Sequence, residues 1–127
     1  MIDHFAPFRT RHTGVFARFN PPALTGGAAS IVVSGDLDTA TSTDFLECAM
    51  ACVGSMRAGD TLELQLEGVS YISSMGVGSL AKILAEADGR QIKLRVSAMS
   101  PACRDVFSVL GLLRYFGVEE PASSNQA

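Results

Sequence analysis

Two segments in the middle of the chain alternate strictly between hydrophobic and polar residues. Residues 61–67 place three leucines on one side and charged or amide residues on the other, and residues 91–97 repeat the pattern with Ile, Leu and Val. Because side chains along a strand point alternately to the two faces of a sheet, both segments predict strands with one buried face. A further strand is predicted over residues 30–34, which are mostly β-branched.

Helical spacing follows the strand predicted at residues 30–34. Hydrophobic residues from Phe45 to Met56 recur three or four positions apart, which predicts an amphipathic helix. Thr41 with Asp44 resembles a capping box at the start of this helix. Residues 35–38 read as the turn that separates the helix from the strand before it.

One further helix is predicted after each of the two alternating strands. One runs from about Met75, and Gly89 stands where the residue after a helix end belongs. The other is marked by Ser100 as its N-cap, by Pro101 at its first position, and by Gly111 after its end.

The N-terminal segment carries a weaker pattern. Residues 1–27 contain three prolines, and only residues 14–19 have the pattern of a strand, which we expect at an edge of the sheet. We therefore assign residues 1–27 to an N-terminal extension. Deletion of residues 1–12 is expected to leave a folded domain.

The alternation of strands and helices predicts a single α/β domain over residues 28–119. Strand–helix–strand units imply a mostly parallel mixed sheet. The polar sides of the two alternating strands indicate that helices pack on one face and leave the other partly open. Residues 112–118 can supply a short final strand, and the polar residues 120–127 are expected to form a disordered tail.

Composition and charge exclude several classes of function. The chain has 127 residues, of which 47% are hydrophobic, so it can bury one compact core. A net charge of −3 without a basic cluster argues against a nucleic-acid surface. No apolar run approaches the roughly 20 residues that cross a bilayer, and the N-terminus lacks the plan of a signal peptide. We expect a cytoplasmic protein with no membrane insertion.

The three cysteines fit a reducing compartment better than a disulfide framework, because their number is odd. Cys48 and Cys52 are four positions apart and can share one helix face, but no further ligand stands at a zinc-like spacing. We interpret them, and the isolated Cys103, as small core residues. No metal and no cofactor is expected.

Two adjacent serines, Ser73 and Ser74, lie between a predicted strand and the helix that follows it. Ser74 can cap the helix, which needs only one hydroxyl that accepts a backbone N–H bond. The positive end of the helix would also stabilise a phosphate on this hydroxyl. Capping and modification are compatible, so the sequence leaves both open.

Two enzymatic interpretations of the same region are weak. A serine nucleophile needs a base, but the two histidines, His4 and His12, lie in the N-terminal segment. The run from Gly76 through Gly78 to Ala81 matches a dinucleotide-binding fingerprint, but no acidic residue follows the next strand to bind a ribose. We therefore expect a protein that is not an enzyme, whose glycines allow close packing or the approach of a partner.

Three segments in the same order resemble the STAS family, the bacterial anti-sigma-factor antagonists and their relatives: Val33–Asp38, Leu66–Gly78 and Ser97–Leu112. The resemblance extends over residues 28–119. It implies a small mixed sheet with helices on one face, in line with the alternation of the strands.

The resemblance also implies a phosphorylation-controlled partner switch. In that family a serine kinase of the histidine-kinase-like ATPase type, which doubles as the anti-sigma factor, phosphorylates a Ser or Thr at the helix start. The unphosphorylated form binds the kinase, and a phosphatase of the PP2C type restores it. Aligned on Gly76, Ser73 stands at the family's aspartate, Ser74 at the first hydroxyl, and Met75 at the usual acceptor. Relatives that read Ile-Ser-Ser-Ala-Gly make Ser74 the first choice as acceptor and Ser73 the second.

The partner-binding residues that the resemblance implies gather in two of the three segments: Gly35, Asp36, Asp38, Ser73, Ser74, Met75, Gly76 and Gly78. Related STAS domains also act without phosphorylation. The alternative function is therefore a non-phosphorylated subunit of a stressosome-like or lipid-transport ATPase complex.

Overall fold

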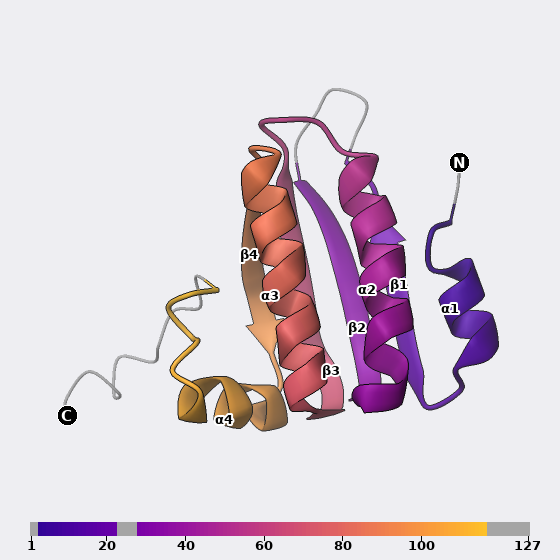
Figure 1. Cartoon of the computed structure of the whole chain (residues 1–127), viewed down its shortest axis with the longest axis vertical. Helices are drawn as coiled ribbons and strands as arrows, with labels where there is room; N and C mark the ends of the chain where they lie inside the picture. Colours follow the sequence, from indigo (N-terminus) through magenta and orange to yellow (C-terminus); the bar gives the residue numbers. More distant parts are fainter. Residues whose placement is uncertain (1–2, 23–27, 117–127) are drawn as a thin grey trace.

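A computed structural model describes residues 3–22 and 28–116 (Figure 1). One four-stranded sheet has the order β1 (Val15–Asn20), β2 (Ala28–Leu37), β3 (Thr61–Ile72), β4 (Lys93–Met99). The helices within these described residues are α1 (Ala6–Arg11), α2 (Thr39–Gly54), α3 (Ser74–Gly89) and α4 (Pro101–Val109). β1 is antiparallel to β2, whereas β2, β3 and β4 are parallel. The predicted mostly parallel mixed sheet is confirmed.

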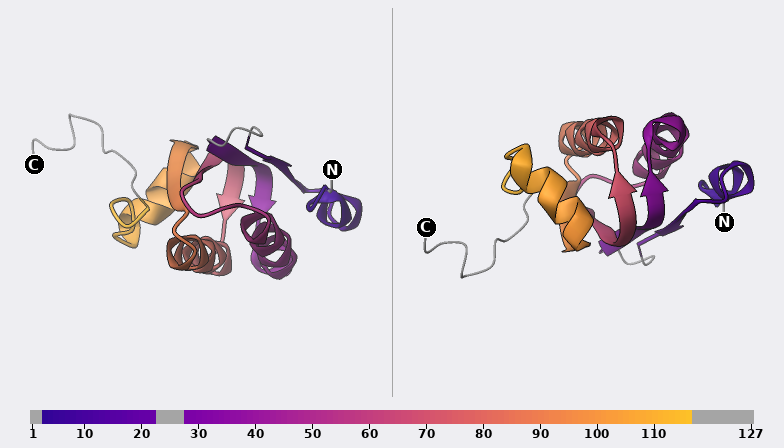
Figure 2. Two further views of the ribbon diagram at one scale, coloured as in Figure 1. Left: turned by 90° about the horizontal axis from the view of Figure 1, so that it is seen from above. Right: turned by 90° about the horizontal axis from the view of Figure 1, so that it is seen from below.

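The two long helices, α2 and α3, lie side by side on one face of the sheet (Figure 2). In the described part of the chain, no helix covers the opposite face. The predicted one-sided arrangement therefore holds for α2 and α3. The short helices lie at the margins: α1 lies beyond β1 and beside α2, and α4 lies near the end of β3.

The alternating strands bury the side that the sequence predicts. Leu62, Leu64 and Leu66 of β3 are fully buried against the helices, and Leu94 and Val96 of β4 are buried beside them. The intervening residues of both strands are partly or fully exposed. Burial of this apolar stripe, at about 25 cal/mol per Å², is the main force that holds the helices on the sheet.

The start of α2 differs from its prediction by one helical turn. Asp38 is the N-cap: its side chain accepts the Thr41 N–H at 3.0 Å, and the Thr41 hydroxyl accepts the Asp38 N–H at 3.1 Å. Asp44 is not part of this box. The expected turn at residues 35–38 is also wrong, because β2 pairs with β1 as far as Gly35 and with β3 as far as Leu37.

The end of α3 differs as well. Gly89 is still helical, and Gln91 takes the left-handed conformation with φ of 61°. The Ile92 N–H then returns to the Ala87 carbonyl at 2.8 Å, which closes the helix end and turns Ile92 into the core. The chain therefore reverses direction at Gln91, two residues after Gly89, where the sequence predicted the helix end. This later reversal allows Ile92 to be buried.

The predicted final strand is wrong within the described residues. Residues 110–116 form turns, and Phe116 is buried against Phe107 with ring centroids 5.0 Å apart. The rest of that strand and the predicted tail at residues 120–127 lie outside the described residues. At α4, the predicted Ser100 cap is confirmed, because its hydroxyl accepts the Cys103 N–H at 3.1 Å.

The N-terminal segment contains the predicted edge strand and a helix, α1, that the sequence analysis missed. Phe5 and Phe8 are fully buried, and their ring centroids lie 5.6 and 6.0 Å from that of Phe45 in α2. At the end of α1, His12 Nε2 lies 2.9 Å from Asp44 Oδ2. These contacts attach residues 3–12 to the core through Phe5 and Phe8, and we now expect their deletion to destabilise the fold.

Substitution of Phe8 tests this revised view. Phe8→Ala is expected to lower the free energy of unfolding by about 3–5 kcal/mol, because it leaves a cavity between α1 and α2. The matched control is Phe16→Ala in β1, where the side chain is 41% exposed and the loss should stay below about 1 kcal/mol. Urea unfolding followed by circular dichroism measures both values. Equal stability of the two variants would show that α1 is dispensable.

Asp44 gives the fold a defined dependence on pH. The hydrogen bond from His12, with added attraction from Arg11, holds the pKa of the Asp44 carboxyl below its ordinary value of 3.8. A carboxyl with a lowered folded pKa stabilises the fold above the ordinary pKa, and this contribution is lost as the pH falls through the folded value. The gap in unfolding free energy between the unaltered chain and Asp44→Asn should therefore shrink from about pH 5 to pH 3. A constant gap would contradict this role.

Candidate functional site

Parallel pairing of β2 with β3 brings two distant segments together at one end of the sheet. Leu37 pairs with Ile72, the last residue of each strand, so Asp38 and Ser73 follow side by side. The Ser73 N–H donates to the Leu37 carbonyl at 3.0 Å. Asp36 and Asp38, two of the residues expected to bind a partner, therefore lie at a strand end next to the serine pair.

The two serines have different roles in the structure. Ser73 is extended, with φ of −89° and ψ of 170°, and its Oγ accepts the Gly76 N–H at 3.1 Å. Ser73 is therefore the N-cap of α3, and the prediction that Ser74 caps the helix is wrong. Ser74 is the first helical residue and is exposed. Among the described residues, its hydroxyl has no hydrogen-bond partner.

Large exposed apolar side chains lie close to Ser74 along the chain. Met75 is 51% exposed in the first turn of α3, and Tyr71 is 52% exposed at the end of β3. Tyr71 pairs across the sheet with Asp36, which is also exposed. The candidate site therefore combines one free hydroxyl, two large apolar side chains and one carboxylate.

The sequence analysis did not single out Tyr71, and the pairing of β3 with β2 is irregular just before it. The pairing runs from Gly35 with Val69 directly to Asp36 with Tyr71, so β3 carries one extra residue, Ser70. A bulge of one residue moves each later side chain to the opposite face. An earlier shift lies between Gln65 and Gly68, so the buried side moves from the leucines to Val69 and returns at Ile72, which leaves Tyr71 exposed.

The two glycines near the start of α3, Gly76 and Gly78, have unequal roles. A Cβ on Gly76 would lie 2.8 Å from the Leu37 carbonyl oxygen and 2.8 Å from Ile72 Cγ1, so this position requires glycine for close packing. Around Gly78 there is open space, and the residue is exposed. The close-packing interpretation is confirmed at Gly76. At Gly78, the approach of a partner remains a prediction.

The predicted partner-binding residues therefore form two groups. Four of them build the frame of the site through a helix cap or through close backbone packing that only glycine allows: Gly35, Asp38, Ser73 and Gly76. The other four are exposed on it: Asp36, Ser74, Met75 and Gly78.

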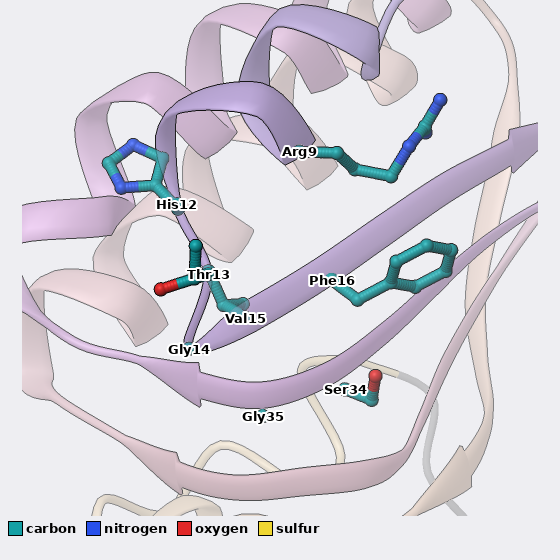
Figure 3. A pocket seen from close by; sticks show the side chains of 8 residues that line it. All are labelled: Arg9, His12, Thr13, Gly14, Val15, Phe16, Ser34 and Gly35. Carbon is teal, nitrogen blue, oxygen red and sulfur yellow. The ribbon is translucent and has the colours of Figure 1, made fainter.

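The N-terminal segment adds a shallow pocket of about 400 Å³ beside this site (Figure 3). Its walls come from the turn between α1 and β1 and from Ser34 and Gly35 of β2. Arg9 lies over the Phe16 ring at 5.6 Å and pairs with Asp3, and His12 pairs with Asp44. Because Arg9 and His12 each already pair with a carboxylate, the pocket is poorly suited to a charged small anion.

The cysteines occupy the positions expected of core residues. Burial raises the pKa of the Cys52 thiol to about 12 and also raises that of Cys103 and of half-buried Cys48. All three are therefore protonated and unreactive at neutral pH. Within residues 3–22 and 28–116, no group of three or more potential ligands is arranged to bind a metal. No helix in those residues is long and apolar enough to span a bilayer.

Comparison with solved structures gives close matches of fold at low sequence identity. An anti-sigma factor antagonist from Mycobacterium paratuberculosis has a TM-score of 0.70 at 21% identity, over 87% of this chain and 89% of that chain. The anti-sigma factor antagonist SpoIIAA in its unphosphorylated form has a TM-score of 0.62 at 19% identity, over 84% and 91% of the two chains.

A larger protein contains a similar domain. The murine anion transporter Slc26a9 matches with a TM-score of 0.65 at 18% identity, over 88% of this chain but 20% of the transporter chain. A sequence comparison with curated proteins found no match. The model of the STAS domain family matches residues 23–125. Since this match covers most of the sequence, the chain belongs to the STAS domain family.

Proposed function

We propose that this protein is an anti-sigma-factor antagonist that binds a cytoplasmic serine kinase, itself the anti-sigma factor, under the control of phosphorylation at Ser74. The observation that carries the proposal is the division of roles between the serines. Ser73 is committed to the helix cap, whereas the Ser74 hydroxyl is exposed and lies between the exposed Tyr71 and Met75 side chains in sequence. The protein acts as a binding module and not as an enzyme.

A phosphate on Ser74 is compatible with the fold. It adds about −1.5 to −2 charges at neutral pH, and Ser74 lies at the positive end of the α3 dipole. The side chain is exposed, so the phosphate stays hydrated and displaces no packed group. The phosphate is therefore expected to change the binding of a partner and not the stability of the fold.

The same phosphate would disrupt a partner surface packed on the site. Met75 and Tyr71 offer apolar contact area, and Asp36 already contributes one negative charge. A partner that desolvates these side chains would have to bury a dianion beside them, and such a charge can cost several kcal/mol. Phosphorylation thus favours release.

The partners follow from the same proposal. The kinase would be of the histidine-kinase-like ATPase type, and a PP2C-type phosphatase would remove the phosphate. Both act in the cytoplasm. Similarity to solved anti-sigma factor antagonists supports the class of partner, and the exposed hydroxyl supports the modified residue.

One observation favours a second candidate function. Met75 occupies the usual acceptor position of the family and cannot carry a phosphate. A constitutive subunit of a stressosome-like or lipid-transport ATPase complex would use the Met75 and Tyr71 surface for permanent binding. Loss of the switch would then leave the surface itself unchanged.

Phosphorylation by the cognate kinase separates these functions. Incubation with the kinase and ATP should add one phosphate, which mass spectrometry maps to Ser74. Ser74→Ala should abolish it and still bind the kinase, Ser74→Asp should weaken binding, and the control Ser73→Ala should keep the phosphate. A phosphate on Ser73 would move the site, and none on either serine with any co-purifying kinase would favour the constitutive subunit.

The two serines should also differ in stability. Ser73→Ala removes the cap of α3 and should cost about 0.5–2 kcal/mol of unfolding free energy. Ser74→Ala leaves the cap intact and should change stability by less than about 0.5 kcal/mol. Thermal unfolding of both variants measures the difference. A larger loss in Ser74→Ala would mean that Ser74 is the cap.

A further inference from the structure

The turn between α1 and β1 is hydrogen-bonded to the frame of the candidate site. The Asp36 N–H donates to the Gly14 carbonyl at 3.0 Å. The next residue, Leu37, accepts the Ser73 N–H at 3.0 Å. Two consecutive residues of β2 therefore connect the N-terminal turn to the start of α3.

The contact between this turn and β2 is unusually close. Gly35 has φ of 88°, and a Cβ at this position would lie 2.3 Å from the Gly14 carbonyl oxygen. Figure 3 shows Gly14 and Gly35 on adjacent segments at the pocket. Because the two backbones touch without a side chain between them, a shift of the turn must displace Asp36.

The position of this turn depends on α1. The helix has six residues, too few to be stable alone. Phe8 fixes its buried side against Phe45, and His12 with Asp44 fixes its last turn to α2. Arg9 adds a bond to the Ala17 carbonyl of β1 at 2.9 Å.

We propose that α1 is a positioning element for the candidate site. Its docking on α2 sets the place of Gly14, which holds Asp36 and, through Leu37, the Ser73 cap. The effect on Ser74 phosphorylation rests on the proposed function, whereas the coupling from α1 to Asp36 and Ser73 does not. A loosened α1 leaves the Ser73–Ser74 start of α3 less ordered and a poorer substrate for the kinase.

Amide hydrogen exchange of the full chain, followed residue by residue by NMR, tests the coupling. Asp44→Asn weakens the attachment of α1 without a cavity, and it should raise the exchange rates of the Asp36 and Ser73 amides by roughly tenfold. The Lys93 amide, which donates to the Asp60 carbonyl at the other end of the sheet, serves as the internal reference and should not change.

A pair of glycine variants isolates the contact itself. Gly35→Ala and Gly59→Ala both force a side chain into positive φ, but Gly59 has open space around it. Gly35→Ala should raise Asp36 and Ser73 exchange, whereas Gly59→Ala should leave both unchanged. Equal effects of the two variants would overturn the proposal.

Two results in Asp44→Asn would overturn the coupling. The first is free exchange of the His12 amide, which donates to Phe8 at the end of α1, while Asp36 and Ser73 stay protected. The second is an equal rise at Lys93, which would show global destabilisation. With the kinase, Asp44→Asn should slow Ser74 phosphorylation several-fold. If no variant is phosphorylated, the proposed function fails, and the exchange data still decide the coupling.

Discussion

The parallel pairing of β2 with β3 is the constraint on which the rest of the site depends. It places Leu37 opposite Ile72, so two helices begin next to each other at the same end of the sheet. The Leu37 carbonyl is used twice: it accepts the Ser73 N–H, and it lies where only a glycine at position 76 can pack. The position of the serine pair is thus set by strand register and backbone contacts more than by the serines themselves.

Much of this frame could be predicted from the sequence, because alternation reports one-sided burial directly. The alternation in residues 61–67 and 91–97 correctly predicted the buried faces of β3 and β4. Ser100 with Pro101 correctly predicted the start of α4. The starts of α2 and α3 were misplaced for one shared reason. A residue at the end of a strand already has the extended backbone of an N-cap, so the capping position falls on the first polar residue after the strand.

The missed elements depend on contacts that no local pattern reveals. α1 is too short to show helical periodicity, and its position comes from Phe5 and Phe8 meeting Phe45 of a distant helix. The path of β3 before Tyr71 contains two register shifts against β2, which move the buried side to Val69 and back to Ile72. Between two neighbouring serines, the sequence offers two equivalent hydroxyls, and only the path of the backbone decides which one becomes the cap.

The separation of frame from surface explains how such a site can change function without a change of fold. Ser73 and Gly76 are tied to the backbone of the helix start, so their replacement disturbs α3. Ser74 and Met75 contribute exposed side chains that the fold does not use. The phosphate proposed for the first helical residue would therefore be sensed by a partner and hardly by the domain, and Met75 can replace a hydroxyl because the fold does not use its side chain.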